Sequence, residues 1–200
     1  MKVNILIDNN SIDKNLLTEH GLSIYIEKNN KKILFDTGAT NAFLENAEKM
    51  HVDLSKIDYV VLSHGHDDHS GGLEYLLNFF NHKPKFISCP NIFCKRYDDE
   101  DGEFGIRLTS KDIEKSFDVI YSAKPYYLSE EILFLGEIPR LNNFEGKTNV
   151  GWNSITKEKD YVTDDSALVI KHQDGLIIIT GCSHSGILNI CDYAKKIFKT

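Results

Sequence analysis

The 200-residue chain contains 41% hydrophobic and 26% charged residues, an ordinary composition for a globular protein with a sizeable core. Its formal net charge of -7 argues against a general nucleic-acid binder or membrane-surface binder, because both need a basic face. The N-terminal apolar run is too short for a signal peptide, and no run approaches the ~20 residues that span a bilayer. We therefore expect one cytoplasmic domain over residues 1–200, with reduced cysteines, that acts on a small molecule rather than on nucleic acid or a membrane.

The first part of the chain predicts short strands and two helices. Residues 3–7 form an apolar run that ends at a turn, and residues 22–38 have the pattern of a hairpin with a Lys-Asn-Asn turn. Residues 39–50 have the apolar spacing of a helix. Residues 57–63 are continuously apolar, which is typical of a buried strand, and residues 73–80 are predicted as helix.

The middle of the chain is less regular. Residues 84–90 predict a strand, whereas the polar stretch 95–118 gives no clear prediction. Residues 120–140 indicate strands with a turn. Residues 141–165 form a long stretch rich in Asn and Gly without periodicity, and loops of this length are usually functional or disordered.

The C-terminal part gives the clearest hairpin. Two β-branched runs within residues 166–181 are joined by a turn that contains Asp174-Gly175. Residues 185–198 then predict an amphipathic helix. Because most strands arrive as hairpins, we expect an α/β sandwich and not a doubly wound parallel sheet.

A cluster of imidazoles and carboxylates follows the predicted buried strand. In HGHDDH, His64 and His66 are two residues apart, so on extended backbone both rings point to one side. Asp68 and His69 follow at once, and Ser70 is a candidate N-cap for the next helix. Imidazole with carboxylate suits zinc, iron or manganese, so the cluster predicts a metal site rather than a polar surface loop.

These residues carry a family resemblance. SHGHDDHSGG at residues 63–72 resembles the HxHxDH signature of the metallo-β-lactamase superfamily, and ILFDTG at residues 33–38 resembles the strand and acidic turn that precede it there. Four more stretches resemble a subfamily often labelled 7,8-dihydropterin-6-methyl-4-(β-D-ribofuranosyl)aminobenzene-5'-phosphate synthase or metallo-hydrolase: residues 6–10, 18–27, 136–140 and 164–190.

The resemblance implies a fold of known type. It runs from residue 3 to about residue 190 and implies a metallo-β-lactamase-like αββα sandwich. Members of the subfamily continue past the last helix with further strands and a late metal ligand. Because this chain ends at Thr200, the resemblance implies a C-terminally shortened form.

The resemblance also assigns roles within the signature. His64 and His66 would bind one divalent ion, and Asp68 and His69 would bind a second. Zinc is the expected metal, with manganese or iron as alternatives. Asp68 would in addition be the catalytic acid or base, whereas Asp67 occupies a variable position and is expected to be solvated.

A second stretch, GCSHSG, is expected to complete the ligand set. His184 is expected as a fifth ligand, with capping of the following helix as the alternative. Cys182 stands where many members of the superfamily place a metal-bridging aspartate. It is expected to be either a ligand or a small buried apolar residue.

Three more carboxylates are candidates for the metal or for its supporting hydrogen bonds. Asp164 and Asp165 stand where other members place a histidine ligand, so either one binds metal or orients a residue that does. Asp36 is expected to accept a hydrogen bond from a ligand histidine; the alternative is a cap on the turn before Gly38.

Two basic side chains are candidates for the substrate pocket. Arg140 offers a planar guanidinium that suits phosphate, and His20 lies in a motif of the subfamily. Either one could instead be a surface or structural residue. The remaining histidines, His51, His82 and His172, are predicted to lie on the surface.

Three functions remain open from the sequence. The first is a hydrolase or transferase with two metal ions, acting on an ester, lactone, amide, phosphorylated or pterin-type substrate. The second is a di-iron redox or sensor protein, which Cys182 in place of an acidic bridge would permit. The third is a non-catalytic domain that keeps one structural metal. An unpaired strand edge would also favour a homo-oligomer.

Overall fold

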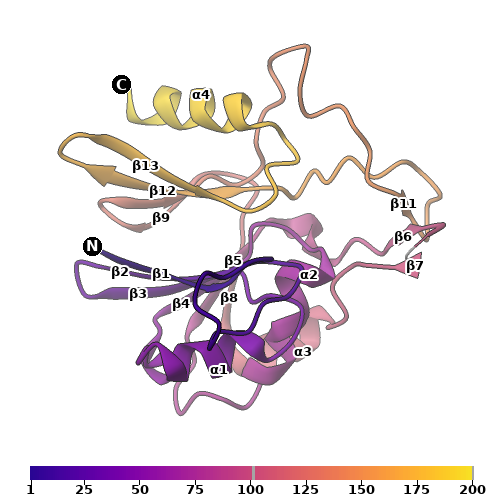
Figure 1. Cartoon of the computed structure of the whole chain (residues 1–200). Helices are drawn as coiled ribbons and strands as arrows, with labels where there is room; N and C mark the ends of the chain where they lie inside the picture. Colours follow the sequence, from indigo (N-terminus) through magenta and orange to yellow (C-terminus); the bar gives the residue numbers. More distant parts are fainter. Residues whose placement is uncertain (101, 200) are drawn as a thin grey trace.

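The computed structural model describes residues 1–100 and 102–199. Two β-sheets pack face to face, and helices cover the outer face of each (Figure 1). Helices α1, α2 and α3 lie against the larger sheet, and α4 lies against the smaller one. The predicted αββα sandwich is confirmed.

The larger sheet has six strands. Their order is β1 (Lys2–Ile7), β2 (Ser23–Lys28), β3 (Lys31–Phe35), β4 (Tyr59–Val61), β5 (Lys85–Ser88) and β8 (Asp118–Tyr121). The first three strands are antiparallel, which confirms the predicted hairpin over residues 22–38. From β3 to β8 the strands are parallel, so their carboxyl ends all meet at one edge of the sheet.

The smaller sheet has four antiparallel strands. Their order is β13 (Gly175–Thr180), β12 (Ala167–His172), β10 (Ile132–Phe134) and β9 (Tyr126–Ser129). The β12–β13 pairing runs from Ala167 opposite Thr180 to His172 opposite Gly175, as the hairpin prediction required. Gly175 has φ +141°, a backbone conformation that side chains rarely adopt.

The main core lies between the two sheets. Phe35 and Val61 of the larger sheet meet Phe134 and Leu168 of the smaller sheet, and all four are buried. On the other face of the larger sheet, a second set that includes Leu34 packs under the helices. Residues 33–35 of β3 and 59–61 of β4 are therefore buried on both faces, which explains why these two runs are continuously apolar.

The helices agree with the sequence predictions except at residues 73–80. They are α1 (Ala42–Lys49), α2 (Asp67–Ser70), α3 (Ser110–Ser116) and α4 (Ile187–Phe198), with 3₁₀ helices at Leu54–Lys56, Gly71–Leu76 and Pro90–Phe93. The predicted helix at 73–80 is wrong, because the chain forms α2 and then a 3₁₀ helix that ends at Leu76. A Cβ on Gly72 would lie 2.2 Å from the Thr37 carbonyl oxygen, so this segment packs tightly on the backbone after β3.

Ser70 stands at the N-cap position of the 3₁₀ helix Gly71–Leu76, as predicted, but its side chain makes no capping hydrogen bond there. Helix α2 begins at Asp67, and the Ser70 hydroxyl donates to the His66 carbonyl oxygen at 2.8 Å. Helix α3 lies in the polar stretch 95–118, which has no clear sequence prediction, and it begins with a capping box between Thr109 and Asp112.

A third, small sheet projects from one end of the sandwich (Figure 1). It contains β11 (Trp152–Asn153), β6 (Arg96–Asp98) and β7 (Gly102–Glu103). These strands come from the two stretches without periodicity, 95–118 and 141–165. None of the helices within residues 1–100 and 102–199 is long and apolar enough to cross a membrane.

Candidate metal centre

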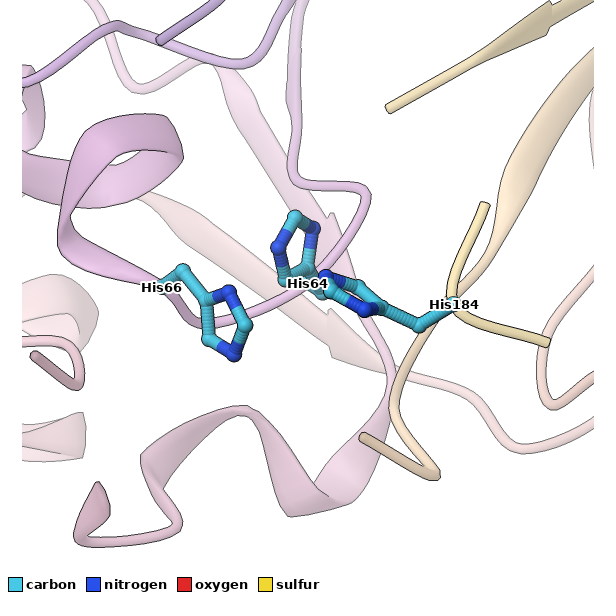
Figure 2. A group of neighbouring side chains, drawn as sticks. All are labelled: His64, His66 and His184. Carbon is cyan, nitrogen blue, oxygen red and sulfur yellow. The ribbon is translucent and has the colours of Figure 1, made fainter. Parts of the chain in front are cut away.

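The predicted ligands converge where two strands end. His64 and His66 follow β4, and His69 lies in α2. Cys182 and His184 follow β13 of the other sheet. Figure 2 shows the rings of His64, His66 and His184 turned toward one another from these two segments. The structure therefore brings together residues that are more than a hundred positions apart in the chain.

Three of the imidazoles form a ligand group. One ring nitrogen each from His64, His66 and His184 lies within 4.8 Å of the others. The Nε2 atoms of all three are buried and have no hydrogen-bond partner among residues 1–100 and 102–199. An unpaired buried nitrogen costs free energy unless something binds it, and three that face one point fit a metal ion.

The ionisation of these rings suits metal binding. Burial, together with the charge of Arg96, lowers the pKa of His66 to about 2. Burial and the nearby His69 lower the pKa of His184 to about 4. Both rings are therefore neutral near pH 7, which is the form that binds metal.

Ser63 fixes which nitrogen of His64 is free. The Ser63 hydroxyl donates to Asp36 Oδ2 at 2.7 Å, so its oxygen accepts from His64 Nδ1 at 2.9 Å. The proton of the ring is thus on Nδ1, and the lone pair of Nε2 faces the metal centre. Ser63 is not among the residues expected from the sequence to support the site, although it directly precedes His64.

A second ligand group adjoins the first. Ligand atoms of His64, His69 and Cys182 lie within 4.8 Å of one another. Nε2 of His69 is 3.2 Å from Cys182 Sγ and 3.4 Å from Asp68 Oδ2. Imidazole, thiolate and carboxylate are all zinc ligands, so this group could hold a second ion.

The surroundings of His69 favour positive charge. Its Nδ1 lies 2.7 Å from Asp36 Oδ2, the hydrogen bond expected of Asp36. Burial lowers the pKa of His69, but the charge of Asp36 and hydrogen bonds with Asp36, Asp68 and Cys182 raise it to about 12. Burial would also raise the pKa of Asp68, but the hydrogen bond and charge of His69 hold it below its usual range.

Asp164 and Asp165 occupy a different place from the ligands. Asp164 accepts the Gly65 N–H at 2.9 Å, and Asp165 accepts the Ser185 N–H at 2.9 Å. Within the described residues, neither carboxylate belongs to the two ligand groups. They instead hold the two loops that carry His64, His66 and His184. Burial raises the pKa of both, that of Asp165 to about 6.

Arg96 is a supporting residue that the sequence did not reveal. Only 1% of it is exposed, its Nε donates to Asp160 at 2.5 Å, and its Nη2 donates to Asp164. Because Asp164 also binds Gly65, the guanidinium supports the backbone between two ligand histidines. Its acidic partners lie 64 and 68 positions away, so no local pattern signals the pairing.

The structure places the two candidates for substrate binding, His20 and Arg140, in different positions relative to the metal centre. His20 lies at the metal centre, where its Nε2 is 3.3 Å from Asp68 Oδ2. Arg140 does not line the cavity there, and its guanidinium donates to the carbonyl oxygens of Tyr161 and Val162 at 2.5 and 3.1 Å. The structure therefore gives Arg140 a structural position. His51, His82 and His172 are exposed, as predicted.

The metal centre opens into a cavity of about 590 Å³. Its walls come from the ligand loops, from β6 and β7, and from the loop before β11. The lining residues are His20, His66, Asp67, Asp68, Asp98, Glu103, Phe104, Val150, Cys182 and His184. This size suits a small molecule.

Comparisons with known proteins point to one superfamily. The family model described as "Metallo-beta-lactamase superfamily" matches residues 18–85. A protein of Methanocaldococcus jannaschii named "Uncharacterized protein MJ0448" is 35% identical over 98% of this chain and 74% of its own length. The 7,8-dihydropterin-6-methyl-4-(beta-D-ribofuranosyl)-aminobenzene-5'-phosphate synthase of the same organism is 35% identical over 90% of this chain and 66% of its own length.

A solved structure agrees with these matches. Tm1679, described as a metal-dependent hydrolase of the beta-lactamase superfamily, aligns with a TM-score of 0.79 and 28% identity. The alignment covers 99% of this chain and 71% of that protein. This chain thus spans about two thirds to three quarters of the length of these relatives.

Proposed function

This chain belongs to the metallo-β-lactamase superfamily, and from that premise we propose that it is a hydrolase with two divalent metal ions and a small-molecule substrate. The observation that carries the proposal is the set of three buried Nε2 atoms, on His64, His66 and His184, that face one point. A structural histidine normally hydrogen-bonds through both ring nitrogens, so three unpaired ones indicate a ligand role.

The donor atoms determine how the ions would be held. His64, His66 and His184 would bind the first ion, and Asp68, His69 and Cys182 would bind the second. Zinc fits these nitrogen, oxygen and sulfur donors, and manganese and iron are the alternatives. Such ions supply Lewis acidity, which polarises a carbonyl or phosphoryl oxygen and lowers the pKa of water.

The protein's own groups would orient and move protons. Ser63 fixes the tautomer of His64, and Asp36 accepts from Nδ1 of His69, so that Nε2 of each ring faces the centre. His69 would lose its Nε2 proton when an ion binds there. Asp68 lines the cavity and is ionised, so its carboxylate is placed to accept a proton from the attacking water. We therefore assign Asp68 as the catalytic base.

A transferase is the second candidate. The relative named as a dihydropterin synthase shares 35% identity over 90% of this chain, which supports a pterin-type or phosphorylated substrate. The same residues would bind the leaving group of that substrate. Hydrolysis and transfer differ in the acceptor, which is water in the first case and a second substrate in the other.

Metal analysis of the purified protein tests both candidates. We expect about two ions per chain after reconstitution with zinc, since the structure offers two ligand groups. Less than about half an ion per chain would contradict both candidates and favour a non-catalytic domain. Bound iron with a reversible redox change would instead favour the di-iron sensor.

A pair of variants connects the metal to activity. His66→Ala should lose the first ion and the hydrolysis of generic esters, lactones and phosphodiesters. His172→Ala is the matched control, because His172 is exposed at the far end of β12. A His66→Ala protein that keeps full activity would remove this cluster from the reaction.

A further inference from the structure

Val162 has a backbone conformation that its own side chain disfavours. Its φ is +51°, in the left-handed region, where a β-branched residue is an outlier. None of the other described non-glycine residues with positive φ is β-branched. Val162 is also fully buried. Such conformations persist only where the surrounding structure holds them, and they are concentrated at functional sites.

Two side chains hold Val162 in this conformation. Asp160 accepts the Val162 N–H at 2.7 Å. Nη2 of Arg140 donates to the carbonyl oxygens of Tyr161 and Val162 at 2.5 and 3.1 Å. These two carbonyl groups belong to the peptide bonds on either side of the Val162 Cα atom. The guanidinium therefore restrains both backbone dihedral angles of Val162.

The turn that begins at Val162 carries the two aspartates of the ligand loops. The Val162 carbonyl oxygen also accepts the Asp165 N–H at 3.1 Å, which closes a four-residue turn. Asp164 and Asp165 then accept the N–H groups of Gly65 and Ser185, each at 2.9 Å. Gly65 lies between two of the ligand histidines, and Ser185 directly follows the third. The conformation of the turn thus determines where both ligand loops are held.

From these contacts we infer that Arg140 positions the metal centre by holding Val162 in its left-handed conformation. Without the guanidinium, Val162 would relax toward negative φ, and the turn would carry its two aspartates away from the ligand loops. Arg140 itself lies outside the cavity at the metal centre and outside both ligand groups. The inference rests on the proposed function, because it takes the three histidines as metal ligands.

Zinc affinity of the reconstituted protein gives the first test. Arg140→Met keeps the length of the side chain but removes its donors, and zinc affinity should fall about 10-fold, as for the loss of other groups that orient ligands. Competition with a chromophoric chelator measures it. Lys28→Met is the matched control, because Lys28 also donates to a backbone carbonyl, that of Lys171, but lies in the β2–β3 turn. An affinity that is unchanged in Arg140→Met would overturn the inference.

A second substitution tests whether Arg140 acts through Val162. Glycine adopts positive φ as readily as negative φ, so in a Val162→Gly background Arg140→Met should lower zinc affinity less than about threefold. Val162→Gly also removes a buried side chain, and the double-mutant cycle separates that effect from the coupling. Equal losses of affinity in the two backgrounds would contradict the inference.

Hydrogen exchange of the metal-free protein keeps the inference separate from the proposed function. The amide groups of Gly65 and Ser185 should exchange at least about fivefold faster in Arg140→Met, without a similar change in the β2–β3 hairpin. Lys28→Met should not show this selective effect. If the wild-type protein binds no zinc, the proposed function fails, and exchange alone decides the inference. Equal exchange of the two amides in wild type and Arg140→Met would overturn it.

Discussion

Asp36 and His69 form a 2.7 Å hydrogen bond in which one carboxylate oxygen also receives the hydroxyl of Ser63. This single oxygen therefore orients a ligand from each metal group, His69 directly and His64 through Ser63. Asp36 has φ +57°, a left-handed conformation that aspartate tolerates better than most residues. The end of β3 thus places one carboxylate next to both ligand groups.

The first prediction concerns this shared oxygen. Asp36→Asn keeps the size of the side chain but replaces a carboxylate oxygen with an amide group. We expect zinc affinity to fall about 10–100-fold, the usual cost of losing such a support. Competition with a chromophoric chelator measures it. Asp174→Asn, in an exposed turn, is the control, and an unchanged affinity in Asp36→Asn would show that Asp36 does not orient the ligands.

The second prediction concerns the thiol of Cys182 in the second ligand group. Cobalt(II) bound to the wild-type protein should show thiolate-to-metal charge-transfer absorption, because Cys182 Sγ lies 3.2 Å from His69 Nε2. Cys182→Ser should lose this absorption and bind the second ion more weakly. Cys191→Ser is the control, since Cys191 lies in α4. If the absorption persists in Cys182→Ser, another residue supplies the sulfur or the second ion lies elsewhere.

Much of this arrangement could be predicted from the sequence. The HGHDDH spacing predicted a cluster of metal-binding side chains because they lie within six residues and follow a buried strand, and the structure brings these side chains together. The β12–β13 hairpin was predicted because Asp174-Gly175 separates two β-branched runs. Both signals come from residues that are close together in the sequence, so they can be recognised without knowing which distant segments come into contact.

What the sequence could not show depends on contacts between distant segments. The antiparallel pair β6–β7 lies in the polar stretch 95–118, and its strands are only three and two residues long. The guanidinium of Arg140 has the right chemistry for phosphate, but in the structure it donates hydrogen bonds to the carbonyl oxygens of Tyr161 and Val162. Residue type alone does not reveal which group a long side chain reaches.

The third prediction concerns the buried guanidinium of Arg96. Arg96→Met would leave Asp160 and Asp164 buried without their cation, so unfolding free energy should fall by about 3–5 kcal/mol. Urea denaturation measures this value. Arg107→Met removes an exposed partner of Asp67 and should cost about 0–1 kcal/mol. Equal costs for the two variants would mean that the Arg96 network contributes no special support to the ligand loop.

The fourth prediction concerns the loop that carries His20. Asn46, buried in α1, donates to the carbonyl oxygens of Leu6 and Leu17 at 2.7 and 2.8 Å and accepts the Leu17 N–H at 2.9 Å. Asn46→Ala would leave these backbone groups without partners and should lower the unfolding free energy by about 2–4 kcal/mol. It should also increase hydrogen exchange around residues 8–20, because the loop loses its anchor to α1.

A matched variant isolates the anchor from simple loss of volume. Asn46→Asp keeps the acceptor for Leu17 N–H but removes the donor to Leu6 and Leu17, so it should retain only part of the protection. Leu44→Ala, in the same helix but half-buried, should change stability without a selective effect on residues 8–20. If exchange in that loop rises equally in Leu44→Ala and Asn46→Ala, the loop is held by general packing of α1 and not by the Asn46 side chain.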